Sequence, residues 1–296
     1  MTPIVLAYSG GFNSSIAAYQ LAETYATDIV TVTVDVGQGH DLGELRRRAT
    51  SCGAVRAHAI DARDELAREF LQASLRRDTL GAGGYPRIDE LPRPLIARKL
   101  IEIAGIEGAR SVAHGSFDRA LDECIRAIDP AMTVLAPARE WHMGAAELAE
   151  YARTRGVPPR NPAETAYRVD RNLWGRIVSW QDGDKPPDAV RPPDSAWPAE
   201  QARLDIRVEQ GVPVSINGVP MSPAELVESL ALIAGRHGVG RLEAGDRGRR
   251  IVCDAPAALV LHTALAAAGE RGGVVSLAVR NGRYDVLTSP ESVTHP

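Results

Sequence analysis

The sequence predicts an α/β fold in which a parallel-sheet domain precedes a smaller α+β domain. Short apolar runs alternate with segments of helical periodicity in the first half, and the first run ends in a glycine-rich loop. Such alternation is typical of a parallel sheet with helices on both faces. A proline-rich stretch, residues 158–198, then interrupts the pattern, and we interpret it as a crossover between domains. For a chain of 296 residues we therefore expect domains at 1–160 and 161–296.

The first domain opens with a strand, a tight loop and a helix. The apolar run Ile4–Tyr8 leads through Ser9-Gly10-Gly11 into apolar residues at helical spacing over Ile16–Ala22. A β-branched run at Ile29–Val36 is the second strand. The same patterns predict further strands at 55–60, 111–114 and 133–135, and helices at 42–52, 61–77, 95–104 and 143–155.

The second domain carries strong turn and helix-start signals. Runs at 204–208 and 212–216 flank Gln210-Gly211 and predict a hairpin. The segment Ser222-Pro223-Ala224-Glu225 combines a capping box with proline at the first helical position, which predicts a helix ending near Gly238. After a predicted helix at 255–270, Asn281-Gly282 joins runs at 274–280 and 283–287 in a second hairpin.

Composition narrows the functional classes. The 34 basic and 38 acidic residues leave a net charge of −4, without the electrostatic signature of a dedicated nucleic-acid binder. We find no apolar run near the roughly 20 residues that cross a bilayer, and no basic leader at the N-terminus, so we expect a cytoplasmic protein without nucleic-acid or membrane partners. The cysteines, Cys52, Cys124 and Cys253, are too far apart to indicate a disulfide framework or a zinc site.

The segment Ser9–Ser15 has the properties of a phosphate-binding loop. Two glycines let the backbone approach an anion closely, three hydroxyl groups can donate hydrogen bonds, and the helix N-terminus adds N–H groups. An ordinary Gly-Ser turn is the alternative. The loop lacks the Gly-Lys-Ser/Thr of a Walker loop and the Gly-x-Gly-x-x-Gly of a dinucleotide fingerprint.

Ala7-Tyr8-Ser9-Gly10-Gly11 at this position resembles the PP-loop ATP pyrophosphatases. Other segments, in the same order along the chain, make the sequence similar to the argininosuccinate synthase family. They are Val34-Asp35-Val36-Gly37-Gln38, Arg93-Pro94-Leu95-Ile96-Ala97-Arg98-Lys99, Ala113-His114-Gly115, Asp170-Arg171-Asn172-Leu173-Trp174-Gly175-Arg176 and Gly235-Arg236-His237-Gly238-Val239-Gly240-Arg241.

The resemblance implies a PP-loop domain followed by a synthetase-type domain, with ATP and Mg²⁺ as cofactors. In that family ATP adenylates the ureido oxygen of citrulline with release of pyrophosphate, and the amine of aspartate then displaces AMP. The nucleotide-binding residues it implies are Ala7, Tyr8, Ser9, Gly10, Gly11, Phe12, Asn13, Ser14, Ser15, Val34, His114 and Gly115. Those implied as catalytic are Ser9, Asn13, Ser14, Ser15 and Asp122.

The sequence departs from the family pattern at the loop and at the implied aspartate site. Asn13 stands where the family has Asp, which removes a charge that favours magnesium pyrophosphate. Phe117, Leu121 and Ile125 replace Thr, Asn and Arg, and Asp122 alone is retained. Each lost charge-assisted hydrogen bond costs about 1.5–3 kcal/mol, so we expect free aspartate to bind poorly.

The implied citrulline site is also altered. Tyr85 and Arg93 match, but Asp89-Glu90 replace Thr-Ser, and the remaining family positions hold Arg168, Ile177, Asp246 and Cys253. Asp89 and Glu90 are equally consistent with solvated loop residues. Arg168 in place of a hydroxyl suits a carboxylate or phosphate. The substrate-binding residues we expect are Tyr85, Arg93, Phe117, Leu121, Asp122, Arg168 and Asp246.

The hypothesis is an AMP-forming C–N ligase that adenylates a urea, amide or carboxylate oxygen and couples it to an amine, with substrates other than citrulline and aspartate. Its expected partners are a small-molecule acceptor and an amine donor. A genuine argininosuccinate synthase, a sulfur-transfer enzyme using Cys124, and a non-catalytic nucleotide-binding protein are the alternatives. We expect a homo-oligomer. The family's long helical segment before the closing hairpin is missing, and the family uses its C-terminal region to assemble a tetramer, so we expect a dimer rather than a tetramer.

Overall fold

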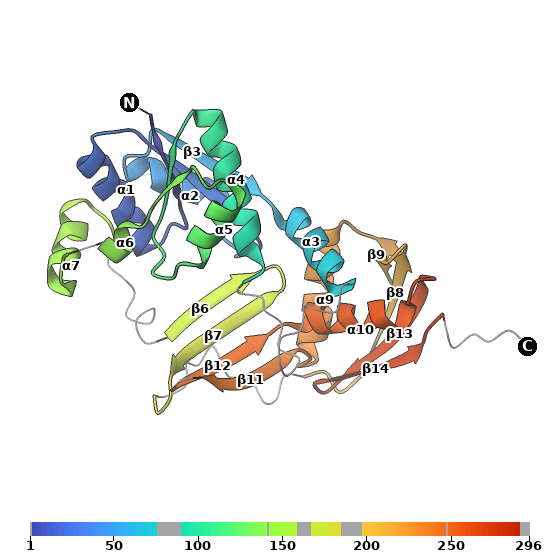
Figure 1. The fold of residues 1–296 in the computed structure, drawn as a ribbon. Helices are drawn as coiled ribbons and strands as arrows, with labels where there is room; N and C mark the ends of the chain where they lie inside the picture. The colour runs from blue at the N-terminus through green and yellow to red at the C-terminus, as the bar shows by residue number, and fades with distance from the viewer. Residues whose placement is uncertain are drawn as a thin grey trace, which may run out of the picture. The chain divides into compact units, whose positions relative to one another are not determined.

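The computed structural model describes residues 2–75, 90–140, 142–158, 167–184, 197–246 and 248–290. The chain forms two compact units, Met1–Ala62 with Pro92–Pro162 and Arg63–Leu91 with Ala163–Pro296. Figure 1 labels helices and strands of both units. No helix in these described stretches is long and apolar enough to span a membrane.

The first unit is built on a five-stranded parallel sheet of order β3-β2-β1-β4-β5. Val5 and Leu6 are neighbours on β1 and are both 0% exposed, so both faces of the sheet are covered. This confirms the predicted fold class. The strands are β1 (Ile4–Ala7), β2 (Ile29–Asp35), β3 (Arg56–Asp61), β4 (Ser111–His114) and β5 (Thr133–Leu135). The helices are α1 (Phe12–Tyr25), α2 (Leu42–Ser51), α4 (Pro92–Glu107), α5 (Ala120–Ile128), α6 (Pro137–Glu140) and α7 (Ala145–Thr154).

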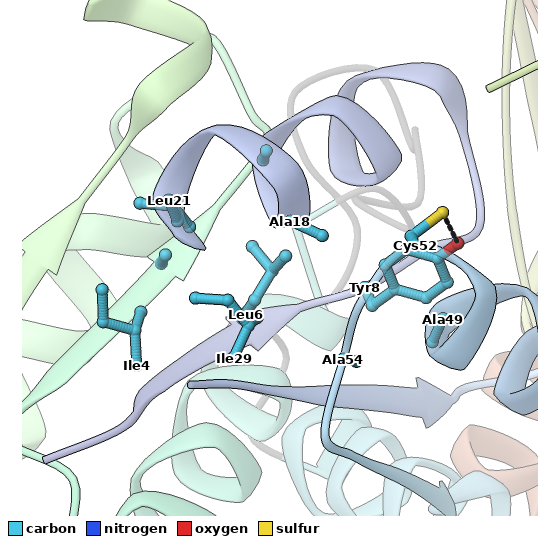
Figure 2. Packing of buried hydrophobic residues seen from close by; sticks show 11 residues of the cluster. Ile4, Leu6, Tyr8, Ala18, Leu21, Ile29, Ala49, Cys52 and Ala54 are labelled. Carbon is cyan, nitrogen blue, oxygen red and sulfur yellow. Dashed lines mark hydrogen bonds between the residues drawn. The ribbon is translucent and has the colours of Figure 1, made fainter. Parts of the chain in front are cut away.

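One core of this unit lies between β1 and helices α1 and α2, and Figure 2 shows it. The side chains of Ile4, Leu6 and Tyr8 point to the same face because they alternate along the strand. Leu21 of α1 and Cys52 at the end of α2 pack against them. The core therefore fixes both helices against the strand that leads into the glycine-rich loop.

The second unit contains two antiparallel sheets, of order β10-β9-β8-β13-β14 and β11-β12-β7-β6. The predicted hairpins β8–β9 and β13–β14 are both present. The strands are β6 (Tyr167–Asn172), β7 (Gly175–Gln181), β8 (Ala202–Glu209), β9 (Val212–Ile216), β10 (Val219–Pro220), β11 (Arg241–Asp246), β12 (Arg249–Asp254), β13 (Gly273–Arg280) and β14 (Arg283–Thr288). The helices are α3 (Arg63–Leu75), α9 (Pro223–Arg236) and α10 (Pro256–Ala268).

Helix α9 begins as the sequence predicts. The Ser222 Oγ accepts from the Glu225 N–H, and the Glu225 carboxylate accepts from the Ser222 N–H. Helix α3 belongs with this unit although it precedes β4 in the chain. The Asp64 carboxylate accepts from the Ala224 N–H at 2.8 Å, and Arg63 pairs with Glu228 at 2.9 Å. Sequence periodicity predicts that helix but not its packing.

The interpretation of residues 158–198 as a crossover is wrong for its middle part. Strands β6 and β7 occupy 167–181 and form a hairpin across Leu173-Trp174. Charged residues in β6 hide its alternation, and the turn has no Asn-Gly or Asp-Gly signal. The partners β11 and β12 were missed for a similar reason, because arginines and acids dominate them.

Candidate active site

The loops after β1 and β4 lie next to each other at the carboxyl edge of the parallel sheet. Ala7 is in register with Val32 on β2 and with His114 on β4. The chain continues from β1 to β2 on one side and returns at β4 on the other, so the strand order reverses there. Open α/β sheets bind their ligands at this position. The structure therefore brings together the two loops that the sequence predicts to bind nucleotide.

The conformation of the first loop requires glycine at position 10. Gly10 has a φ of +74°, and a Cβ there would lie 2.2 Å from the Leu45 Cδ2. Gly11 is the N-cap of α1 and supplies no side-chain oxygen to the first-turn amides, and the first turn holds no acidic residue. A helix start of this kind favours an anion.

The serine hydroxyls of the loop differ in their surroundings. Ser9 is exposed, whereas Ser14 and Ser15 are 4% and 2% exposed. The Ser14 Oγ donates to the Gly11 carbonyl at 3.1 Å, and the Ser15 Oγ lies 3.1 Å from the Tyr8 Oη. Burial raises the pKa of Tyr8, so its hydroxyl stays protonated. Ser14 and Ser15 thus hold the loop, and the exposed Ser9 also contributes, because its Oγ lies 3.2 Å from the Ser14 Oγ and accepts from the Gly11 N–H.

Asn13 connects the two loops. Its Nδ2 donates to the Gly115 carbonyl at 3.5 Å. A Cβ on Gly115 would lie 3.2 Å from the Ser14 nitrogen, so any side chain there would push the second loop a few tenths of an ångström away from the start of α1. An aspartate at position 13 could not donate this hydrogen bond.

Arg48 of α2 also supports the loop, and sequence analysis did not identify it. Its Nη1 donates to the Gly10 carbonyl at 2.9 Å, while its Nη2 pairs with Glu44 at 2.8 Å. The i,i+4 spacing of Glu44 and Arg48 predicts only a surface ion pair. The contact with Gly10 depends on how α2 packs, which no local pattern reveals.

The loop after β2 is closed by its own side chains. Val34 is 6% exposed near the end of the strand. The Gln38 Oε1 accepts from the Val36 N–H and its Nε2 donates to the Val34 carbonyl, while the Asp35 carboxylate accepts from the Gly37 N–H. These contacts fix the third strand end of the predicted nucleotide site.

A buried ionic network lies behind the second loop. His114 and Asp122 are each 2% exposed, and the His114 Nε2 lies 2.8 Å from the Asp122 Oδ1. Arg139 donates to both carboxylate oxygens, at 3.1 and 2.6 Å, and also to the Asp118 carbonyl. Arg139 was not predicted, because α5 and α6 bring residues 122 and 139 together only in the folded chain.

The protonation states in this network follow from its contacts. The His114 Nδ1 accepts from the Ser116 N–H at 3.2 Å, so its Nε2 carries the proton that it donates to Asp122. Burial holds the pKa of His114 below its ordinary value and keeps the ring neutral. Burial alone would raise the pKa of Asp122, but the hydrogen bonds from Arg139 and His114 lower it. Asp122 is therefore an ionised carboxylate whose two oxygens are already engaged.

The other predicted substrate residues of the first unit have different exposures. Phe117 is 60% exposed, Leu121 is partly buried, and Ile125 is fully buried in α5. Arg93, at the start of α4, pairs with Asp118 at 3.5 Å. The segment after Gly115 thus presents an aromatic ring where the sequence resemblance implies a hydroxyl.

The predicted residues outside this unit are placed as follows. Arg168 on β6 is 61% exposed and pairs with Asp170 at 2.8 Å. Asp246 ends β11, but its side chain lies outside the description, as does Tyr85. Among the described residues, no group of three His, Cys, Asp or Glu could hold a metal ion.

The parallel sheet and the glycine-rich loop between β1 and α1 define a nucleotide-binding α/β protein of the PP-loop class. Residues 3–158 match the family model of the arginosuccinate synthase N-terminal HUP domain, and residues 167–269 match that of the C-terminal domain. The chain belongs to the argininosuccinate synthase family. It is accordingly an ATP-dependent ligase that forms AMP and pyrophosphate.

Curated relatives are similar in sequence to this chain over most of its length. An argininosuccinate synthase of Streptococcus thermophilus is 36% identical over 88% of this chain and 69% of its own length. The argininosuccinate synthase of Oceanobacillus iheyensis is 38% identical over 88% of this chain and 67% of its own length. Among solved structures, the NMN synthetase of Francisella tularensis is similar at 16% identity and a TM-score of 0.37, over 53% of this chain and 63% of that one.

The Arg48 contact predicts a specific effect on ATP binding. Replacing Arg48 with Ala removes the donor to the Gly10 carbonyl and loosens the loop. We expect the KM for ATP to rise roughly three- to tenfold with a smaller change in kcat, since a partly exposed charged hydrogen bond is worth about 1 kcal/mol.

Arg47→Ala, on an exposed position of the same helix, is the matched control and should leave the KM unchanged. Arg48→Lys should recover part of the loss. An Arg48→Ala enzyme with the wild-type KM would show that the contact does not position the loop.

Proposed function

We propose that the chain catalyses C–N bond formation in two steps, with ATP bound at the loops after β1, β2 and β4. In the first step the acceptor's oxygen attacks the α-phosphorus of ATP, and pyrophosphate leaves. In the second step an amine attacks the activated carbon, and AMP leaves. The observation that supports this is the uncapped start of α1 beside the glycine-rich loop, where the leaving pyrophosphate would be stabilised by N–H groups.

Magnesium fits this site as part of the nucleotide complex. Mg²⁺ is usually held by substrate phosphates with only one or two protein carboxylates. This agrees with a loop that offers the amide of Asn13 and no carboxylate cluster. When bound, the ion would spread the charge that develops on the pyrophosphate.

We further propose that the amine donor is not free aspartate. In the segment implied to contact aspartate, Phe117 and Leu121 replace polar residues, and Ile125 replaces an arginine that contacts citrulline in the family. Asp122, which the segment retains, has its carboxylate engaged by His114 and Arg139. A donor with an apolar or aromatic part would suit the exposed ring of Phe117 better than a second carboxylate would.

A genuine argininosuccinate synthase is the second candidate. The identity of 36–38% with argininosuccinate synthases over 88% of the chain favours it. The sulfur-transfer alternative gains no support, because burial raises the pKa of Cys124 and lowers its thiolate fraction. The predicted dimer stays a prediction.

The decisive assay supplies ATP and Mg²⁺ with panels of ureido, amide and carboxylate acceptors and of amines. We expect AMP and pyrophosphate in equal amounts with one pair, and no argininosuccinate above background from citrulline and aspartate. Argininosuccinate formation at rates typical of a ligase would establish the second candidate. ADP as the nucleotide product would exclude both.

Asn13 provides a separate prediction about the loop. Asn13→Asp replaces the donor to the Gly115 carbonyl with a charged oxygen that repels it and the triphosphate. We expect slower pyrophosphate release at every Mg²⁺ concentration, by roughly tenfold for the loss and the added repulsion.

Asn13→Ala separates the two effects, because it removes the donor without adding charge and should lose less activity. Faster release by Asn13→Asp across the Mg²⁺ titration would instead mean that the site is a weakened version of an aspartate-containing loop.

A further inference from the structure

Two sequence motifs that carry the family resemblance lie in the second unit, which brings them together. They are the segments Asp170–Arg176 and Gly235–Arg241, about sixty residues apart in the chain. Both line a cavity of about 520 Å³ that lies wholly among residues of this unit. This volume is within the range of small-molecule sites. Its lining includes Arg171, Arg176, Trp197, Gly238, Arg241 and Asp254.

Figure 1 shows the sheet β11-β12-β7-β6. The four charged residues of the cavity form one row across it. Arg171 is the direct cross-strand partner of Arg176, Arg176 of Asp254, and Asp254 of Arg241. Direct partners on antiparallel strands point to the same face. The row therefore places three guanidinium groups and one carboxylate along one wall of the cavity.

Two of the guanidinium groups in this row, those of Arg176 and Arg241, pair with carboxylates. The Asp254 carboxylate pairs with Arg176 at 2.6 Å and with Arg241 at 3.5 Å, and Arg241 also reaches the exposed Glu243 at 3.5 Å. Arg171 is exposed and has no ion pair or hydrogen bond to the described residues. Arg171 lies directly opposite Arg176, an arrangement of like charges that disfavours the sheet, although the Asp254 carboxylate offsets the charge of Arg176.

An exposed aromatic ring completes the cavity. Trp197 is 41% exposed and lies over Gly238, where a Cβ would come within 2.3 Å of its Cζ2. The close approach explains the glycine, but it does not explain why so large an apolar ring stays exposed. A flat group stacked on the ring would cover it.

The cavity differs from the predicted substrate site of the same sheet. Side chains alternate between faces along a strand, so Arg168 on β6 points away from the face that carries Arg171. Ile177 and Cys253 are direct partners on β7 and β12, and they alternate in the same way with Arg176 and Asp254. Arg168 and the two altered family positions Ile177 and Cys253 therefore lie on the face of the sheet opposite the arginine row.

We propose that this cavity is a second ligand site, which binds a small molecule bearing a carboxylate or phosphate together with a flat group. Arg171 and Arg176 bind the oxyanion, and Trp197 stacks on the flat group. Arginine suits both anions because its planar fork can donate two parallel hydrogen bonds. All the residues that line the site belong to the second unit.

Titration calorimetry and tryptophan fluorescence with phenyl phosphate and benzoate test the proposal, with neutral benzamide as the reference. We expect saturable binding of at least one anion and weak binding of benzamide. Arg171→Ala should weaken anion binding roughly tenfold or more, and Trp197→Phe should remove the fluorescence change. The preferred probe identifies phosphate or carboxylate as the recognised group.

Arg207→Ala, an exposed arginine on β8 of the same unit, is the matched control and should bind as the wild type does. Arg171→Ala should also unfold at the wild-type temperature or above, because it removes a like-charge pair. No saturable binding, equal binding of benzamide, or equal affinities of the Arg171→Ala and Arg207→Ala proteins would overturn the proposal.

Discussion

The register of β1 with its two parallel neighbours is the constraint on which the active site depends. Ala7 pairs with Val32 on one side and with His114 on the other, so β1 and β4 end at one level while β2 continues to Asp35. Because the strand order reverses between β1 and β4, the glycine-rich loop and the His114-Gly115 loop must meet there. Residues more than a hundred positions apart then approach within hydrogen-bond distance, as Asn13 and Gly115 do.

Much of the packing around this edge holds the two loops in place. Arg48 donates a hydrogen bond from α2 to the Gly10 carbonyl, and the Leu45 side chain lies where a Cβ on residue 10 would be. Behind the second loop, Arg139 neutralises the buried Asp122, whose removal would leave a cation without its partner. Preorganisation of this kind means that the backbone N–H groups need little rearrangement when charge develops on a phosphate.

The sequence predicts those parts of the fold whose signals are local. Alternating apolar runs reveal the parallel sheet, Ser222 and Glu225 reveal the start of α9, and Asn281-Gly282 reveals the last hairpin. The loop Ser9–Ser15 is recognisable because glycines and hydroxyls follow a buried strand. Residues 167–181 were misread because charged side chains on β6 obscure the period of two and the turn to β7 has no Asn-Gly or Asp-Gly signal.

Tertiary contacts account for the rest of what sequence reasoning missed. Arg48, Arg139 and the row from Arg171 to Arg241 acquire their roles from neighbours that are distant in the chain. Asp122 shows that a motif alone does not reveal the contacts a side chain makes in the folded protein. Its position in a motif indicates a substrate contact, whereas its burial shows a carboxylate engaged within the protein.

The most direct test of the account is backbone amide exchange with and without ATP and Mg²⁺. If the loops after β1 and β4 bind the nucleotide, exchange should slow in peptides covering residues 7–15 and 113–117, and it should stay unchanged in β8 and β13. Slower exchange confined to the second unit, with no change in those two loops, would contradict the assignment of the ATP site.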